Sequence, residues 1–137
     1  MIREYGGLKL QEALYGLLDD QLETSVYDYV PKKAGYPYVR LGNESNVDDS
    51  TKTHYRTKMK IDIQVFTTNE GYKEAKLIMN EIYKIISNKS NKITLDSFVV
   101  TLDRLISTTF YEVTSDNPVK ESVRIGCATY QFNLQGV

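Results

Sequence analysis

The side chains able to perform acid–base, nucleophilic or metal chemistry are few, and they do not combine into a catalytic or metal-binding group. His54 is the only histidine, so neither a histidine-based triad nor a multi-histidine metal site can be completed. Cys127 stands among apolar residues with no base beside it, which favours a small buried hydrophobe over a nucleophile. We therefore expect no catalytic residue, no metal and no cofactor, and infer that the protein is not an enzyme.

Carboxylates gather in one polar stretch, residues 43–52, which contains Glu44, Asp48 and Asp49. Their spacing matches no calcium-binding loop, and the glycine that such a loop needs at its turn is absent. The glycines elsewhere follow neither the phosphate-loop nor the dinucleotide-binding pattern. The stretch is typical of a solvated acidic loop.

Tyrosine is abundant, with 11 copies and no tryptophan. Several lie in or beside three neighbouring predicted strands: Tyr27, Tyr29, Tyr36, Tyr38 and Tyr55. Because tyrosine is enriched at protein interfaces, this grouping indicates a protein–protein surface, and the alternative is that these rings cap the core with their hydroxyls in water.

Three basic residues, Arg56, Lys58 and Lys60, share one face of a predicted strand. Such a stripe either contacts phosphates, with the tyrosines as stacking platforms, or forms a solvated face. The net charge of −1 disfavours a protein whose main role is to bind nucleic acid.

Hydrophobic spacing predicts two amphipathic helices. In the first, from Gly6 to about Glu23, leucines recur every three or four residues and share one face. In the second, roughly residues 70–88, isoleucines form a similar stripe behind a cap at Thr68 or Asn69. Each helix therefore has a face that another element must cover.

Five stretches have the pattern of strands: 26–30, 36–42, 55–65, 97–112 and 120–134. Pro37 makes the second an edge strand or a strand start, because proline lacks a ladder donor. A slip in the alternation at Gly126–Cys127 predicts a β-bulge in the last. The order α-β-β-β-α-β-β predicts one α+β domain over residues 1–137, with two helices packed on one face of a mostly antiparallel, mixed sheet.

A string of segments then carries a resemblance to a known family. The segments are Tyr36–Gly42, the loop end Asp49–Thr53, Ile61–Thr67, Gly71–Ala75, and the helix through Ile78, Ile82 and Ile85. In this order and spacing they resemble the tail completion family of long-tailed, siphovirus-type bacteriophages, whose members act as tail terminators or tail-to-head joining proteins. Phe66 stands where many relatives have a tryptophan.

The resemblance implies a structural virion protein that caps the completed tail tube as a hexameric ring, ends tail elongation and forms the head–tail joining surface. Its partners would be further copies of itself, the tail tube protein and the head connector or stopper protein. DNA would only pass through the channel, and no membrane would take part. The protein would be made in the bacterial cytoplasm and would lie at the head–tail junction end of the tail.

We expect the interface residues to lie on the two strands 36–42 and 55–65 and on two turn-rich loops, 43–53 and 114–120. The candidates are Tyr36, Tyr38, Arg40, Asp48, Asp49, Lys52, Arg56, Lys58, Asp116 and Asn117. Strand 36–42 would meet the tube or a neighbouring subunit by edge pairing, and an acidic loop facing the channel would keep DNA from adhering. The alternatives are a small single-stranded nucleic-acid-binding module, another head–tail connector component, and an enzyme or ligand binder for which no residue set can be named.

Overall fold

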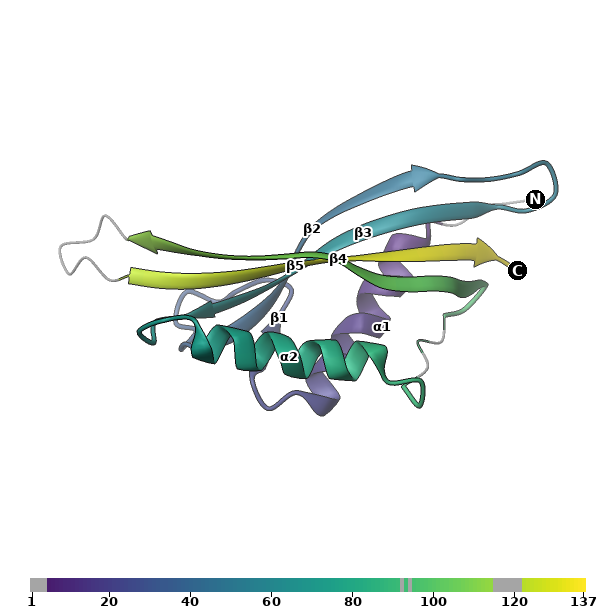
Figure 1. Ribbon diagram of the computed structural model, residues 1–137. Coiled ribbons are helices and arrows are strands. Elements are labelled where there is room, and N and C mark those ends of the chain that lie inside the picture. The colour runs from purple at the N-terminus through teal and green to yellow at the C-terminus, as the bar shows by residue number, and fades with distance from the viewer. Residues whose placement is uncertain (1–4, 92, 94, 115–121) are drawn as a thin grey trace.

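The computed structural model describes residues 5–91, 93, 95–114 and 122–137. The elements are α1 (Gly6–Gln21), β1 (Ser25–Tyr27), β2 (Tyr38–Asp48), β3 (Arg56–Thr67), α2 (Lys73–Ser87), β4 (Phe98–Thr114) and β5 (Ser122–Gly136). The order of these elements and the α+β class are those predicted from the sequence, so both predictions are confirmed. Both helices lie on the same side of one long, twisted sheet (Figure 1). Within the described residues, no helix is long and apolar enough to cross a membrane.

The sheet has the strand order β1-β2-β3-β5-β4, in which only β1 and β2 run parallel. Its centre is the pair β3–β5, which stays in register from Arg56 opposite Gln135 to Thr67 opposite Arg124. Register shifts occur only in the strands beside this pair, once where β2 faces β3 and twice where β4 faces β5. The irregularities of the described sheet therefore lie toward its margins.

The predicted β-bulge at Gly126–Cys127 is wrong, because β5 passes through these residues without a shift against β3. The hydrophobic phase changes there for another reason. Ile125 is buried on the face away from the helices, whereas Ala128 and the alternate residues beyond it are buried on the helix side. Gly126 is needed because a Cβ atom there would come within 2.9 Å of the Phe110 ring.

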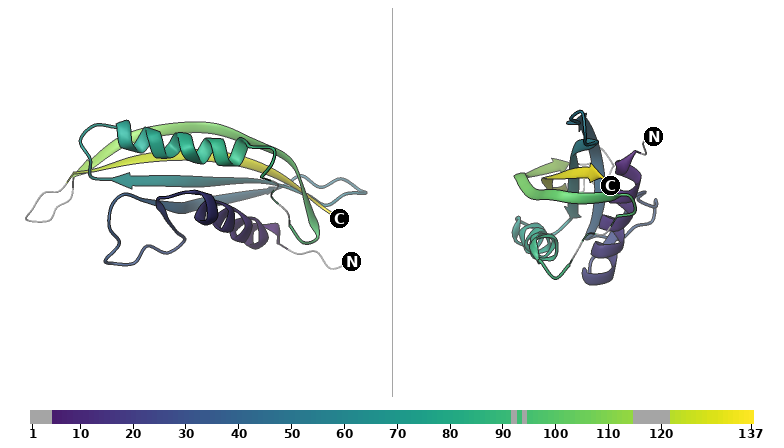
Figure 2. Two further views of the ribbon diagram at one scale, coloured as in Figure 1. Left: turned by 90° about the horizontal axis from the view of Figure 1, so that it is seen from below. Right: turned by 90° about the vertical axis from the view of Figure 1, so that its right-hand side faces the viewer.

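The core fills the space between the sheet and the two helices. The alternation predicted for β3 is confirmed, since its residues on the helix side are buried from Thr57 to Thr67. Helix α2 buries the predicted stripe: Ala75, Ile78, Met79, Ile82, Ile85 and Ile86. Leu10, Leu14 and Leu18 of α1 are fully buried. Figure 2 shows α1 under the β1–β2 side of the sheet and α2 under β3 and β5.

Strand β2 is longer than predicted. Residues 43–48, expected in the polar loop, continue the strand and pair with β3 as far as Asp48 opposite Thr57. A polar sequence can extend a strand here because the partner strand supplies the hydrogen bonds and only one face has to be apolar. Pro37 directly precedes the strand, which confirms the predicted strand start. β1 covers β2 from Tyr38 to Arg40, so the beginning of β2 is not an edge.

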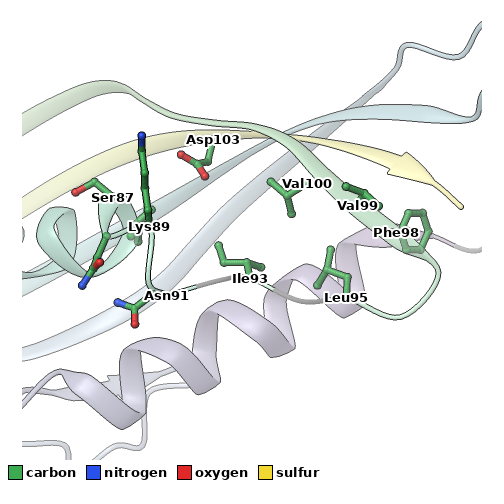
Figure 3. A pocket seen from close by; sticks show the side chains of 11 residues that line it. Ser87, Lys89, Asn91, Ile93, Leu95, Phe98, Val99, Val100 and Asp103 are labelled. Carbon is green, nitrogen blue, oxygen red and sulfur yellow. The ribbon is translucent and has the colours of Figure 1, made fainter.

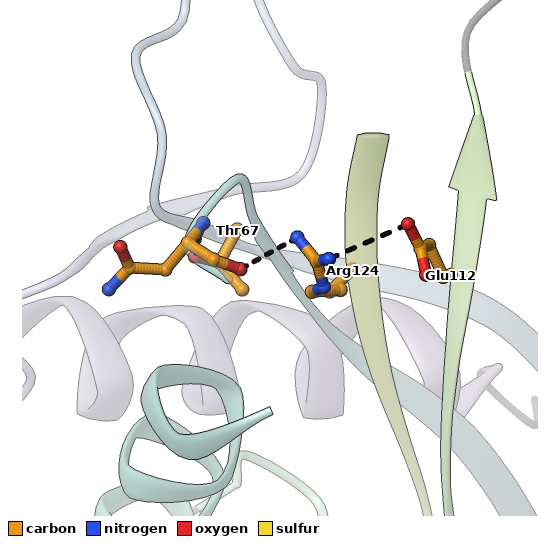
Figure 4. Close-up of polar contacts among 4 residues, drawn as sticks. Thr67, Glu112 and Arg124 are labelled. Atoms are coloured by element: carbon orange, nitrogen blue, oxygen red, sulfur yellow. Dashed lines mark hydrogen bonds and ion pairs between the residues drawn. The ribbon is translucent and has the colours of Figure 1, made fainter. Parts of the chain in front are cut away.

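A polar network holds the start of α2 against the sheet. The Glu74 carboxylate accepts hydrogen bonds from Thr67 Oγ1 at 2.5 Å and from Asn69 Nδ2 at 2.6 Å. Arg124 of β5 donates to the Asn69 carbonyl at 2.9 Å and pairs with Glu112 of β4 at 3.5 Å (Figure 4). The predicted cap at Thr68 or Asn69 is wrong, because the helix begins later, after Tyr72. Three strands and α2 are thus joined at one end of the sheet.

Candidate interaction surface

The face of the sheet away from the helices, here called the outer face, has no element of the described chain packed over it. One end of it carries a cluster of rings, the aromatic patch, formed by Tyr27, Tyr36, Tyr38 and Phe66. Tyr38 stacks on Tyr36 with ring centroids 5.3 Å apart and on Phe66 at 4.9 Å, and Tyr27 meets its edge at 5.9 Å. The sequence places these rings together because Tyr38 pairs with Phe66 across the β2–β3 ladder.

The environment of Tyr38 disfavours ionisation of its phenol. Burial raises the pKa of Tyr38, the neighbouring Tyr36 adds to the rise, and Arg40 partly opposes it. Arg40 itself is exposed and faces outward beside Gln64. The patch is thus a neutral, mainly apolar surface with one cation at its border, which is the composition typical of the centre of a protein–protein interface.

The β2–β3 turn holds the predicted acidic residues in an ordered arrangement. The Asp48 carboxylate accepts from the Ser50 amide at 3.0 Å and from its hydroxyl at 2.5 Å. Ser50 Oγ in turn accepts from the Arg56 amide at 3.1 Å, and the Asp49 amide donates to the Arg56 carbonyl at 2.9 Å. Asp48 therefore stabilises the turn, while Asp49 and Lys52 are exposed beside it.

The predicted interface residues form two separate groups. Tyr36, Tyr38 and Arg40 lie at the start of β2, and the turn residues lie at its far end, about 33 Å away for an extended strand of this length. Lys58 lies with the turn group but on the outer face, whereas Asp48 shares the side of Thr57 and the helices. Asp116 and Asn117, and the turn predicted with them, lie outside the described residues.

An open groove runs beneath β4, between that strand and the end of α2 (Figure 3). Its volume is about 540 Å³, and Ile93, Leu95, Phe98 and Val100 give it an apolar lining. Its polar rim has Ser87, Lys89, Asn91 and Asp103, which include no histidine and no cysteine. Among the described residues, no three His, Cys, Asp or Glu side chains come together as metal ligands.

Comparison with known proteins identifies the family. The profile of the tail completion protein gp17 family matches residues 6–117. The chain belongs to this family. It is therefore a structural tail protein of a phage-type virion. No curated protein matches the chain significantly.

A solved structure shares the fold of this tail completion protein. A chain of the virion of a native gene transfer agent particle superposes with a TM-score of 0.64 at 23% sequence identity. The superposition covers 98% of this chain and 100% of that one, so it includes β5, which lies beyond the family match. The common fold thus spans both helices and the complete sheet.

Sequence reasoning missed part of the outer face. Phe66 and Ile125 belong to the aromatic end, and Arg104 lies in line with the basic stripe, but none was predicted as an interface residue. The signal for Phe66 was present, since this aromatic residue directly follows the third predicted strand, in phase with its polar face. Arg104 required the register of β4 against β5, because two shifts change the faces of that strand.

Proposed function

We propose that this tail completion protein caps the finished tail tube as a ring of six copies, ends tube elongation and presents the surface that joins the head. The match to the tail completion family over residues 6–117 carries the proposal. One domain, residues 1–137, would supply every contact. The partners would be neighbouring copies, the tube protein and a head connector, at the head–tail junction.

The sheet offers the unlike surfaces that such a ring requires. A closed ring of identical subunits uses a heterologous interface, in which one patch docks against a different patch of the next copy. Among the described strands, β4 has a partner only on its β5 side, at one edge of the sheet. At the other edge, β1 covers only the first residues of β2, so no described strand pairs with Leu41–Asp48 on that side. Together with the uncovered outer face, these edges support head-to-tail assembly.

The proposal is tested by a phage that carries an early stop codon in this gene. Electron microscopy of the lysate should show heads without tails beside tails of uncontrolled length. Normal-length tails joined to filled heads would contradict the proposal. Tails of correct length that fail to join heads would assign the protein to the connector side of the junction instead.

The aromatic patch is the surface that we expect to bind the tube or a neighbouring subunit. Tyr38→Asp places a charge between Tyr36 and Phe66 and should reduce complementation of the stop-codon phage at least tenfold. Tyr29→Asp is the matched control, because its ring is 83% exposed and should tolerate the charge. Full complementation by a folded Tyr38→Asp protein would exclude the patch as a contact.

A further inference from the structure

The half of the outer face farther from the aromatic patch is basic. The pairing registers place Arg56, Lys58 and Lys60 of β3 and Arg104 of β4 on this side of the sheet. We call these four residues the basic patch. Lys60, Gln131 and Arg104 lie side by side across three strands, and the row beside it is Lys58, Asn133 and Leu102. The patch therefore spans the sheet from β3 to β4.

No carboxylate interrupts the basic patch within these paired rows. Between the cations stand the amides Gln131, Asn133 and Gln135, which can donate hydrogen bonds to an anion. The nearest carboxylate on the same face of β3 is Asp62, which accepts a hydrogen bond from Thr129 at 2.7 Å. The ion pairs found among the described residues involve none of the four cations.

The arrangement suits an extended polyanion. Alternate residues of a strand are about 6.8 Å apart, and β3 and β4 lie about 10 Å apart across β5, so the charges form a shallow array and not a pocket. Lys58, Lys60 and Arg104 are exposed, while Arg56 is half-buried and its Nε has no hydrogen-bond partner within the described chain. Such an array matches a repeating phosphate backbone better than it matches a single carboxylate.

The aromatic patch is a poor platform for unpaired bases. Tyr36 and Phe66 both stack on Tyr38, so the rings of the patch are stacked on one another. Single-strand binding proteins need free aromatic faces on which successive bases stack. The aromatic patch also lies at the opposite end of the outer face from the basic patch. A duplex, bound only through its phosphates, therefore fits this face better than a single strand.

We propose that the basic patch binds the phosphate backbone of duplex DNA without reading its sequence. This extends the proposed function, because the channel of a tail ring brings DNA next to the protein. Arg56, Lys58, Lys60 and Arg104 supply the charge, and the amides of β5 supply neutral donors. The contact is electrostatic and exchanges readily, so DNA is held loosely and can still move.

The test measures binding of the purified protein to a fluorescein-labelled 30-base-pair duplex between 50 and 200 mM NaCl. Four phosphate contacts predict a slope of about −3.6 for log K against log [salt], a loss of about 150-fold in affinity over this range. Lys58→Gln with Lys60→Gln should reduce the slope to about −1.8 and the loss to about 12-fold. The control pair, Lys73→Gln with Lys89→Gln, makes the same charge change at exposed sites on the helix side and should keep the wild-type slope.

Three results of the binding test would overturn the inference. They are absence of salt-dependent duplex binding, an equal effect of both variant pairs, and tighter binding to a single strand of the same length. A Lys58/Lys60 variant that changes only the oligomeric state in sedimentation would show that a second copy, not DNA, covers this face. Failure of duplex binding together with uncontrolled tails in the stop-codon phage would remove this inference and leave the proposed function intact.

Discussion

At the scale of single residues, Tyr130 shows how a buried polar group constrains this protein. Its side chain is 1% exposed on the helix side of β5, and its hydroxyl has no hydrogen-bond partner within the described residues. Burial raises the pKa of Tyr130 from 10.0 to about 12, and the neighbouring Tyr83 adds to the rise. An ionised phenolate is therefore poorly accommodated in the core.

Tyr130→Phe should leave the free energy of unfolding unchanged at pH 8 or raise it by up to about 1 kcal/mol, because an unpartnered buried hydroxyl is removed. Because folding raises the pKa of Tyr130, the stability that goes with its neutral phenol is fully present below pH 10. That stability is lost as the pH rises through about 12. Between pH 8 and 11 the wild type should lose about 1.4 kcal/mol more than Tyr130→Phe. Urea unfolding at both pH values measures this difference, and parallel losses in the two proteins would contradict it.

The sequence predicted only some of the residues of the interaction surface. The sequence showed that Arg56, Lys58 and Lys60 share a face, since a strand alternates with period two. It did not show that Asp48 fixes a turn, because that role depends on hydrogen bonds with Ser50 two residues away. A carboxylate that stabilises its own turn and one that faces a partner have the same appearance in a sequence.

At the scale of elements, the start of α2 depends on one carboxylate. Glu74 lies in the first turn of the helix, where the macrodipole favours a negative charge, and accepts hydrogen bonds from Thr67 and Asn69. Glu74→Ala should therefore lower the free energy of unfolding by about 1–3 kcal/mol. Glu81→Ala is the control, at an exposed site whose ion pair in the described chain is with Lys84, and it should cost less than about 0.5 kcal/mol. Equal costs in thermal or urea unfolding would show that the Glu74 network is not stabilising.

Periodic elements were predicted well, and irregular ones were not. The stripe of α2 and the alternation of β3 come from a strong local pattern, so both faces were assigned correctly. The extension of β2 through Asn43–Asp48 was missed, because its residues favour loops and only the pairing with β3 makes them a strand. Tertiary context outweighs propensity at that place.

At the scale of the whole molecule, charge distribution should govern how DNA leaves the virion. The turn with Asp48 and Asp49 adjoins the basic patch through Arg56, with Asp48 on the helix side of the sheet. Asp48→Lys with Asp49→Lys should make this end of the molecule positive and slow DNA release during infection. Ejection kinetics and infectivity measure the effect, and unchanged values in a folded variant would exclude it. The thermal stability of the variant must be checked, since Asp48 also holds the turn.

The fold class and the family could be predicted from the sequence of the whole chain. The arrangement of the interaction surface could not. The order of segments was enough to predict an α+β domain of the tail completion family. The two groups of interface candidates could not be separated from sequence, because Tyr38 and Asp48 are close in number but lie at opposite ends of one strand. Only strand length and register show which candidates can touch the same partner.

The continuous pairing of β3 with β5 has a consequence for synthesis. The ladder joins residues 56–67 to residues 124–135, so of the strands that pair with each other these two are the farthest apart in the chain. A nascent chain on the ribosome can form the β2–β3 hairpin early, but β4 then has no neighbour and part of the core stays open. Truncation before residue 122 removes the strand that joins the two halves of the sheet. Folding is therefore completed only after β5 has left the ribosome.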